Sequence, residues 1–126
     1  MEFPENVKYT KDHEWVRIEG DSAVVGITEF AQSELGDLVF VDLPTTGKQV
    51  AAHGNLCVVE STKAASDVYS PIAGNVVEVN TALNDDPSLI NKSPYTDGWI
   101  AKLTQFSASE VSSLMSADEY RKLIGK

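Results

Sequence analysis

Short runs of β-branched and apolar residues recur along most of the chain, and turn-forming residues separate them. WVRIE, AVVGI, LVFVD, LCVVE and NVVEV are the clearest of these runs. Runs of about five residues are typical of strands, and the Gly, Pro and Asn residues between them favour tight turns. The pattern therefore predicts an all-β fold with minor helices.

The expected strands follow one another closely enough to pair as hairpins. A Gly-Asp step between two β-branched runs is a hairpin signal, and Gly20-Asp21 separates the first two runs. The remaining runs are bounded by Pro, Gly or Asn in the same way. The expected strands cover residues 13–20, 22–28, 37–44, 55–62, 65–71, 74–80 and 97–104.

Two short helical patterns interrupt the strands. Residues 28–36, TEFAQSELG, predict a helix with Thr28 as its N-cap and Gly36 just beyond its last turn. A single helical turn is expected at residues 87–90, PSLI, inside a longer loop. Both are short enough to connect strands without disturbing a β fold.

The C-terminus predicts two consecutive helices. SASE at 107–110 and SADE at 116–119 both place Ser at an N-cap position and Glu three residues later, which is the capping-box pattern. The apolar residues after each box recur at helical spacing and should pack on the strands. They are Val111, Leu114, Met115, Tyr120, Leu123 and Ile124.

A short internal echo suggests two related halves. GDLVFV at 36–41 and GNVVEV at 74–79 share a leading Gly, a polar second residue and an apolar run. One copy precedes the expected Lys63 hairpin and the other follows it. The echo predicts a pseudo-twofold β sandwich, although any two Val-rich strands share this much.

Size and charge limit the possible partners. The chain has 126 residues, enough for one domain over 1–126, and its formal net charge is −9. An acidic chain is unsuited to nucleic acid or anionic membranes and favours basic partner surfaces. It has one cysteine, no targeting segment and no apolar run near the ~20 residues of a membrane span. We expect a soluble cytoplasmic protein, while a mature organellar form stays open.

No residue spacing supports catalysis by the chain itself. His13 and His53 lie outside any metal-binding pattern, and Cys57 lies inside an apolar run. There is no nucleophile elbow, phosphate loop or dinucleotide-binding glycine motif. A pair formed by Cys57 and either histidine is the one arrangement that the spacing leaves open. The sequence predicts no enzyme and no metal site.

Lys63, in VVESTKAASDVY, stands at the expected tip of a hairpin. It has three readings: a solvated turn lysine, a Schiff-base lysine or an attachment point. A Schiff-base lysine needs burial or nearby cations, whereas Glu60 and Asp67 would favour the charged ammonium. An attachment point needs an exposed turn with small neighbours. Ser61, Thr62, Ala64, Ala65 and Ser66 meet that need.

These motifs resemble the glycine cleavage system H proteins over essentially the whole chain. ESTKA followed by DVYSPIAG resembles their lipoyl-attachment hairpin, and HEWV, VGIT, TGK and SPYTDGWIAKL occur in the family's order. Biotin carriers usually place the lysine between methionines. Here Thr62 and Ala64 flank it, which favours lipoate. Lipoyl domains of 2-oxo acid dehydrogenases share the hairpin but generally lack HEWV and SPYTDGW.

The resemblance implies a barrel-sandwich hybrid with an N-terminal extension and C-terminal helices. It implies a non-catalytic carrier, with lipoate amide-linked to Lys63. The implied partners are a pyridoxal-phosphate glycine decarboxylase, a tetrahydrofolate-dependent aminomethyltransferase, dihydrolipoamide dehydrogenase and a lipoate-attaching enzyme. The carrier would move the aminomethyl group of glycine and then electrons between them. Two alternatives stay open: a lipoate-relay carrier, and an unmodified β adaptor in which Lys63 has no role.

The resemblance also implies roles for four further residues. Glu14 and Asp67 would form a cleft for the loaded arm, because its amine is cationic when protonated. Glu60 and Gly47 would be recognised by the modifying enzyme, although Gly47 is equally explained by a turn that needs positive φ. Relatives often carry histidine near the end of the first helix, where this chain has Glu34.

Overall fold

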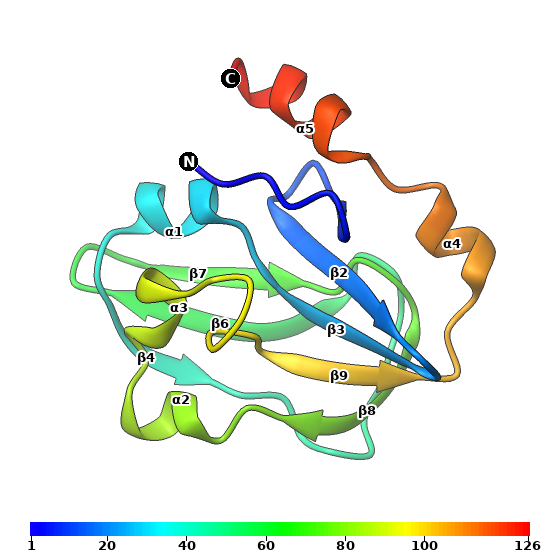
Figure 1. The fold of residues 1–126 in the computed structure, drawn as a ribbon. Helices are drawn as coiled ribbons and strands as arrows, with labels where there is room; N and C mark the ends of the chain where they lie inside the picture. Colours follow the sequence, from blue (N-terminus) through cyan, green and yellow to red (C-terminus); the bar gives the residue numbers. More distant parts are fainter.

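Nine strands form two sheets in the computed structural model, which describes residues 1–126 (Figure 1). The six-stranded sheet has the order β1 (Lys8–Tyr9), β2 (Glu14–Glu19), β3 (Ser22–Ile27), β9 (Ala101–Thr104), β8 (Gly74–Val79) and β5 (Gln49–Val50). The three-stranded sheet has the order β4 (Leu38–Asp42), β6 (Asn55–Ser61) and β7 (Ala65–Tyr69). All pairs are antiparallel, as expected for strands joined by short turns.

The first predicted hairpin is confirmed. β2 and β3 pair in continuous register from Glu14 opposite Ile27 to Glu19 opposite Ser22. Gly20 adopts φ +62 in the turn between them, a conformation that glycine allows without steric cost. This register fixes Glu14 at the far end of the hairpin, beside the start of the first helix.

Five short helices lie around the sheets: α1 (Glu29–Leu35), α2 (Ala82–Asp85), α3 (Leu89–Lys92), α4 (Ala108–Ser112) and α5 (Ala117–Ile124). α1 begins and ends as predicted, because the Thr28 side chain accepts from Ala31 N and Gly36 takes φ +85. α3 overlaps the helical turn expected at 87–90. α2 was not expected, because it lies in a polar stretch without a side-chain cap.

The capping boxes at the C-terminus have different outcomes. Ser116 and Glu119 form the predicted reciprocal box at the start of α5. The helix predicted after Ser107 is present as α4, but its capping box is not: Ser107 makes no side-chain cap, and the Glu110 carboxylate instead accepts from Ala73 N at 3.0 Å. Leu123 also departs from the expected apolar stripe, with 53 % of its surface exposed.

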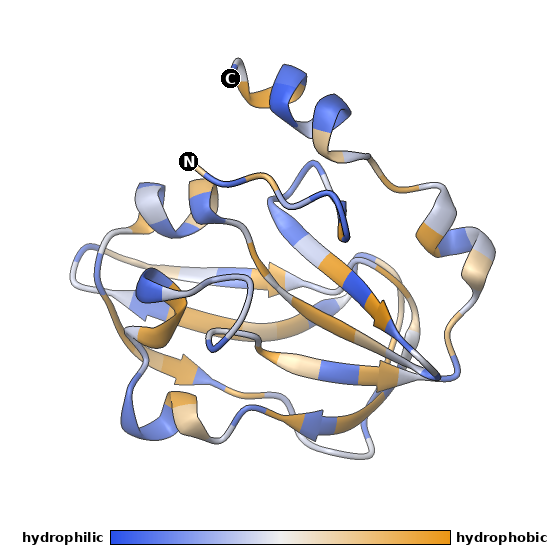
Figure 2. Ribbon diagram, viewed as in Figure 1, coloured by the Kyte–Doolittle hydropathy of each residue, from blue (hydrophilic) through white to orange (hydrophobic).

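The core divides into two clusters. The larger one lies between the two sheets, where Figure 2 shows hydrophobic segments on strands of both sheets. The smaller one is largely aromatic, built around Tyr9, Trp15 and Tyr120, and joins the N-terminal segment to α5. Packing explains why residue 26 is glycine, because a Cβ there would lie 2.7 Å from the Trp15 ring. Both ends of the chain are therefore tied into the β body.

The internal echo corresponds to a structural similarity. β4 belongs to the three-stranded sheet and β8 to the six-stranded sheet. Each strand is irregular at the same point of the motif, between Leu38 and Phe40 in β4 and between Val76 and Glu78 in β8. Each sheet thus contains one strand with a register shift at the equivalent position of the motif. None of the helices has the length and apolar character that crossing a bilayer requires.

Candidate functional site

Lys63 lies at the tip of the β6–β7 hairpin, and its neighbours shape the turn. Ser61 N donates to Ala64 O at 2.8 Å, and the Ser61 hydroxyl accepts from the backbone N–H groups of Lys63 and Ala64. A serine that binds the next backbone amides in this way is a standard turn former. The tip is therefore ordered, and Lys63 is exposed on it.

The Lys63 side chain lies over the C-terminal end of α1. Its Nζ donates to the Glu34 carbonyl at 3.1 Å, and helix C-termini favour cations. Gly36 makes room for the lysine stem, because a Cβ there would lie 3.2 Å from Lys63 Cε. Thr62 N also donates to Asp37 O at 3.2 Å. Hairpin tip and helix end thus form one local unit.

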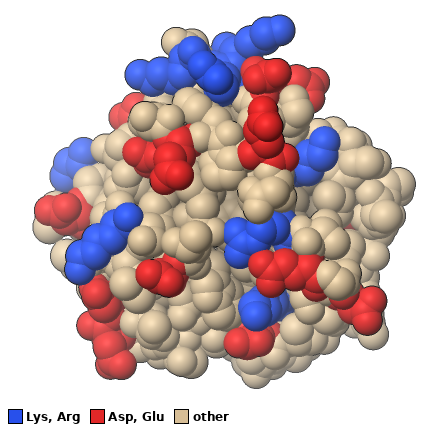
Figure 3. All heavy atoms as spheres, viewed as in Figure 1, with Lys and Arg blue, Asp and Glu red and all other residues tan.

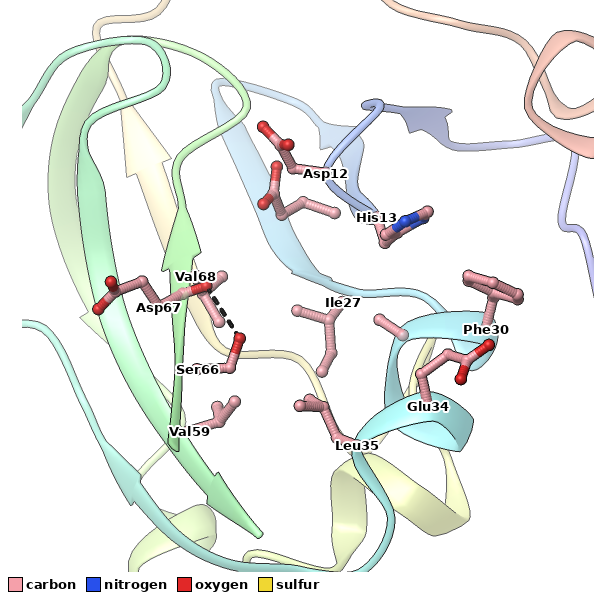
Figure 4. A pocket seen from close by; sticks show the side chains of 12 residues that line it. Asp12, His13, Ile27, Phe30, Glu34, Leu35, Val59, Ser66, Asp67 and Val68 are labelled. Atoms are coloured by element: carbon pink, nitrogen blue, oxygen red, sulfur yellow. Dashed lines mark hydrogen bonds between the residues drawn. The ribbon is translucent and has the colours of Figure 1, made fainter. Parts of the chain in front are cut away.

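A cleft of about 270 Å³ opens between α1, β7 and the turn that precedes β2 (Figure 4). Its walls are mostly apolar: Ile27 from β3, Phe30, Ala31 and Leu35 from α1, and Val59 and Val68 from the three-stranded sheet. Acidic side chains and one histidine lie among them. An apolar cleft with few polar groups is the usual form of a small-ligand site.

Glu14 is the buried acid of this cleft. Only 3 % of its surface is exposed, and its carboxylate accepts from Thr10 Oγ1 at 2.6 Å and from Tyr69 N at 3.4 Å. Burial raises the pKa of Glu14 to about 7, against the opposing effect of these two hydrogen bonds. Near neutral pH the group is therefore poised between its charged and neutral forms.

Asp67 contributes to the same cleft in a different way. It lies opposite Val58, on the outer face of the three-stranded sheet, whereas its neighbours Ser66 and Val68 face inward. Figure 4 shows its carboxylate pointing away from the cleft, and it accepts from Asn55 Nδ2 at 3.0 Å. The structure therefore brings the Glu14 carboxylate into the cleft but not the Asp67 carboxylate.

Sequence reasoning did not place Asp12, His13 or Ser66 in the cleft, and it named Glu34 only as the residue that replaces a histidine of relatives. Asp12 and His13 directly precede Glu14, so contiguity was an available signal. His13 takes φ +70, which is uncommon for a side-chain-bearing residue. Its Nδ1 lies 2.8 Å from the Tyr120 hydroxyl on α5. No local pattern in the sequence connects residue 13 with residue 120.

The two residues expected to contact a modifying enzyme lie on different sheets. Glu60 is exposed on β6, one cross-strand pair from the tip, between Phe40 and Ala65. Gly47 lies in the turn before β5, with φ +90, and its N–H donates to Val76 O on β8 at 2.7 Å. A Cβ at Gly47 would meet nothing within 4 Å. The turn is accessible, and its φ also explains the glycine.

The residues present suit a group that is attached to the hairpin and reaches into the cleft. The hairpin supplies an exposed primary amine, and the neighbouring cleft supplies apolar walls and one buried acid. Figure 3 shows acidic side chains scattered over the face viewed, with one group of Lys and Arg over α5 and others interspersed among the acids. The site can therefore hold an attached, partly apolar group that carries a positive charge.

Comparison with known proteins places these features in one family. The family model described as Glycine cleavage H-protein matches residues 7–126. A glycine cleavage system H protein of Chlorobaculum parvum is 52 % identical over 128 residues, with all of both chains covered. One from Staphylococcus carnosus is 46 % identical, again over all of both chains. The crystal structure of a glycine cleavage system H protein from Mycobacterium marinum matches 98 % of this chain and 99 % of its own, with TM-score 0.88 and 43 % identity.

Proposed function

The chain belongs to the glycine cleavage H-protein family, and from that premise we propose that Lys63 is the residue that carries lipoate. The single observation that supports this assignment is its position at an ordered, exposed hairpin tip between small residues. An enzyme that acylates the Nζ atom must enclose the tip, and bulky neighbours would prevent that. Lys63 is the lysine of this hairpin.

The protein is a lipoyl carrier of the glycine cleavage system and is not itself an enzyme. Lys63 would hold lipoate, which would supply the sulfur chemistry that links glycine decarboxylase, the aminomethyltransferase and dihydrolipoamide dehydrogenase: carriage of the aminomethyl group of glycine and then of electrons. The chain's own part is to present, shelter and release the arm. Tethering replaces separate encounters by local delivery, which raises the effective concentration.

We propose that Glu14 shelters the cationic end of the loaded arm. A cation that enters the cleft meets a carboxylate that is held by Thr10 and Tyr69 and excluded from water. Such a cation stabilises the ionised form of Glu14 and lowers its pKa, so docking and deprotonation favour each other. An uncharged arm lacks this attraction, and only the difference between the two states shifts the equilibrium. The Asp67 carboxylate points away from the cleft, so it would attract the cationic arm only through its long-range electrostatic effect.

We propose Glu60 and Gly47 as contacts of the lipoate-attaching enzyme. Glu60 offers an exposed charge one cross-strand pair from the tip. Gly47 offers a turn without a side chain, so a partner surface can approach its backbone closely. An acidic contact near Lys63 also fits the net charge of −9, which favours basic partner surfaces.

The proposal also covers the domain organisation and the cellular location of the carrier. Residues 1–126 would act as one carrier domain, because β1, β2 and α5 share one aromatic cluster across the chain's two ends. The cytoplasm is the proposed location, and the single buried cysteine needs no oxidising compartment. Fractionation of native cells with an antibody against the carrier tests the location.

Peptide mapping of the protein from lipoate-replete cells tests the Lys63 assignment. We expect the mass of one lipoyl amide on the peptide that contains Lys63 and unmodified masses at the other lysines, which serve as internal controls. An unmodified Lys63 peptide from such cells would overturn the assignment. Lipoylation at another lysine would overturn it equally.

A further inference from the structure

The hydroxyl of Tyr120 joins two segments that are distant in sequence. Tyr120 lies on α5, is fully buried and stacks on Tyr9 with ring centroids 4.7 Å apart. Its oxygen lies 2.8 Å from Thr28 Oγ1 and 2.8 Å from His13 Nδ1. Aromatic packing alone explains the ring. The two hydrogen bonds of the hydroxyl point to a more specific role.

The two partners of this hydroxyl belong to two adjoining walls of the cleft. His13 lies in the turn next to Glu14, on one wall. Thr28 is the N-cap of α1, whose side chains form the other wall. Thr28 N also donates to His13 O at 3.0 Å, so a backbone bond and a side-chain bridge meet at the same corner.

Only one arrangement of protons gives every buried hydroxyl hydrogen an acceptor. Thr28 Oγ1 already accepts from Ala31 N, and the Tyr120 oxygen is the one acceptor within reach of its own hydrogen. Thr28 therefore donates to Tyr120, and Tyr120 donates to His13 Nδ1. A buried donor without a partner would be costly, which favours this order. His13 is then neutral and carries its hydrogen on Nε2.

We propose that Tyr120 is a positioning residue of the carrier: its hydroxyl holds the two cleft walls together and keeps His13 in the neutral Nε2–H form. The proposal rests on the function proposed above for Glu14. A protonated His13 would add a positive charge to the cleft lining and repel the cationic arm. Donation from Tyr120 to Nδ1 prevents that charge, because the imidazolium has no free acceptor nitrogen.

The surroundings of His13 act in both directions on its charge. Burial lowers the pKa of His13, whereas the nearby carboxylates of Asp12 and Glu34 raise it. Phe30 packs against the ring at 4.9 Å and adds no charge. The hydrogen bond from the Tyr120 hydroxyl favours neutral His13, as burial does. The C-terminal helix therefore belongs to the functional site, although it supplies no side chain to the cleft lining.

Tyr120→Phe tests the proposal against Tyr9→Phe as a matched control. Both variants remove a hydroxyl from the same fully buried stack, but the Tyr9 hydroxyl donates to Pro4 O at 2.6 Å, away from the cleft. The first measurement is the ¹⁵N spectrum of the imidazoles in the unmodified protein over pH, with His53→Asn to assign the two histidines. The second is release of ammonia or formaldehyde from the purified aminomethyl-loaded carrier, beside Glu14→Gln.

We expect Tyr120→Phe to move the titration of His13 to higher pH and to mix its tautomers. Release should become about two- to tenfold faster, the range of one hydrogen bond. Tyr9→Phe should leave both measurements unchanged while lowering the melting temperature by a similar amount. An unchanged His13 spectrum or an unchanged release rate in Tyr120→Phe, while Glu14→Gln releases faster, overturns this inference alone. If Glu14→Gln also releases at the wild-type rate, the proposed role of the cleft fails and this inference fails with it.

Discussion

The attachment hairpin exposes its charged group to solvent, whereas the adjoining cleft buries its own. Lys63 keeps its ammonium exposed, on a turn held by local backbone and serine hydrogen bonds. Glu14 keeps its carboxylate buried, and this raises its pKa to about 7. An exposed tip serves other proteins, which must reach it. A buried acid serves only a group that is brought into the cleft, so the structure separates presentation from shelter.

The largest expected effect is on the hairpin side. Lys63→Arg should abolish lipoylation and all carrier activity, because Arg retains the charge but offers no acylatable primary amine. Stability should change by no more than about 0.5 kcal/mol, as for other surface substitutions. Intact mass and thermal unfolding measure the two effects. Lys92→Arg, exposed on α3, is the control, and loss of lipoylation there would contradict the assignment.

The same contrast explains what the sequence could predict. The hairpin follows from neighbours: β-branched runs on either side, small residues at the tip and one lysine. Thr28, Gly36 and the α5 capping box are local in the same sense, and their predictions are confirmed. The strand order of the sheets depends on distant contacts and was not predicted; the resemblance to the family implied only the barrel-sandwich architecture.

The cleft depends on contacts between distant residues, so its details could not be predicted. Glu14 and Asp67 were expected to act together, but the β6–β7 register turns the Asp67 carboxylate outward to Asn55. The α4 capping box failed for a similar reason, because Glu110 binds the distant Ala73 N. A long-range partner outcompetes a local one when it satisfies an otherwise unpaired backbone group. No residue spacing encodes that choice.

Glu14 and Asp67 provide the next test of the contrast between buried and exposed charge. Glu14→Gln should speed loss of the aminomethyl group from the isolated loaded carrier about ten- to a hundredfold, the value of one charge-assisted hydrogen bond in a dry cleft. Asp67→Asn removes the same charge from an exposed site and should change the rate less than about twofold. Release of ammonia or formaldehyde is the measurement. Equal rates in all three proteins would mean that apolar packing alone protects the arm.

The cost of burying Glu14 should appear as a pH dependence of stability in the unmodified protein. Its pKa is raised in the folded state from 4.5 to about 7, so the folded chain binds the extra proton. The associated stability is fully present below pH 4.5 and is lost as the pH rises through about 7. Glu14→Gln removes this dependence and should be more stable than the wild type at pH 8 by about 1–3 kcal/mol.

Urea unfolding at pH 4.5 and pH 8 measures this difference, with Asp67→Asn as the control of equal charge change. The exposed Asp67 carboxylate should leave the pH dependence as it is in the wild type. If Glu14→Gln gains nothing at pH 8, the buried acid does not destabilise the fold, and the contrast between the two regions weakens.

Gly47 lies outside both regions and has two explanations that substitution can separate. Gly47→Ala should cost about 1 kcal/mol because φ +90 is strained for alanine. Gly47→Asn tolerates positive φ better and should cost less, yet it adds a side chain to the turn. If a modifying enzyme presses on this turn, the folded Asn variant should be lipoylated about two- to threefold more slowly, the effect of losing one weak contact. A wild-type rate for both variants would leave only the turn explanation.

The smallest expected effect compares two exposed acids on one sheet face. Glu60 lies in the cross-strand row next to the tip, between Phe40 and Ala65, and Asp67 lies two rows farther from the tip, opposite Val58. A solvated ion pair with a basic partner contributes about 0.2–1 kcal/mol, so Glu60→Gln should slow lipoylation by no more than about fivefold. Asp67→Asn should slow it less, because it lies farther from Lys63 along the sheet. Initial rates of lipoylation with matched melting temperatures test this order. If Asp67→Asn has the larger effect, the enzyme reads the outer face of β7 and not the edge of the tip, and the acidic handle must be reassigned.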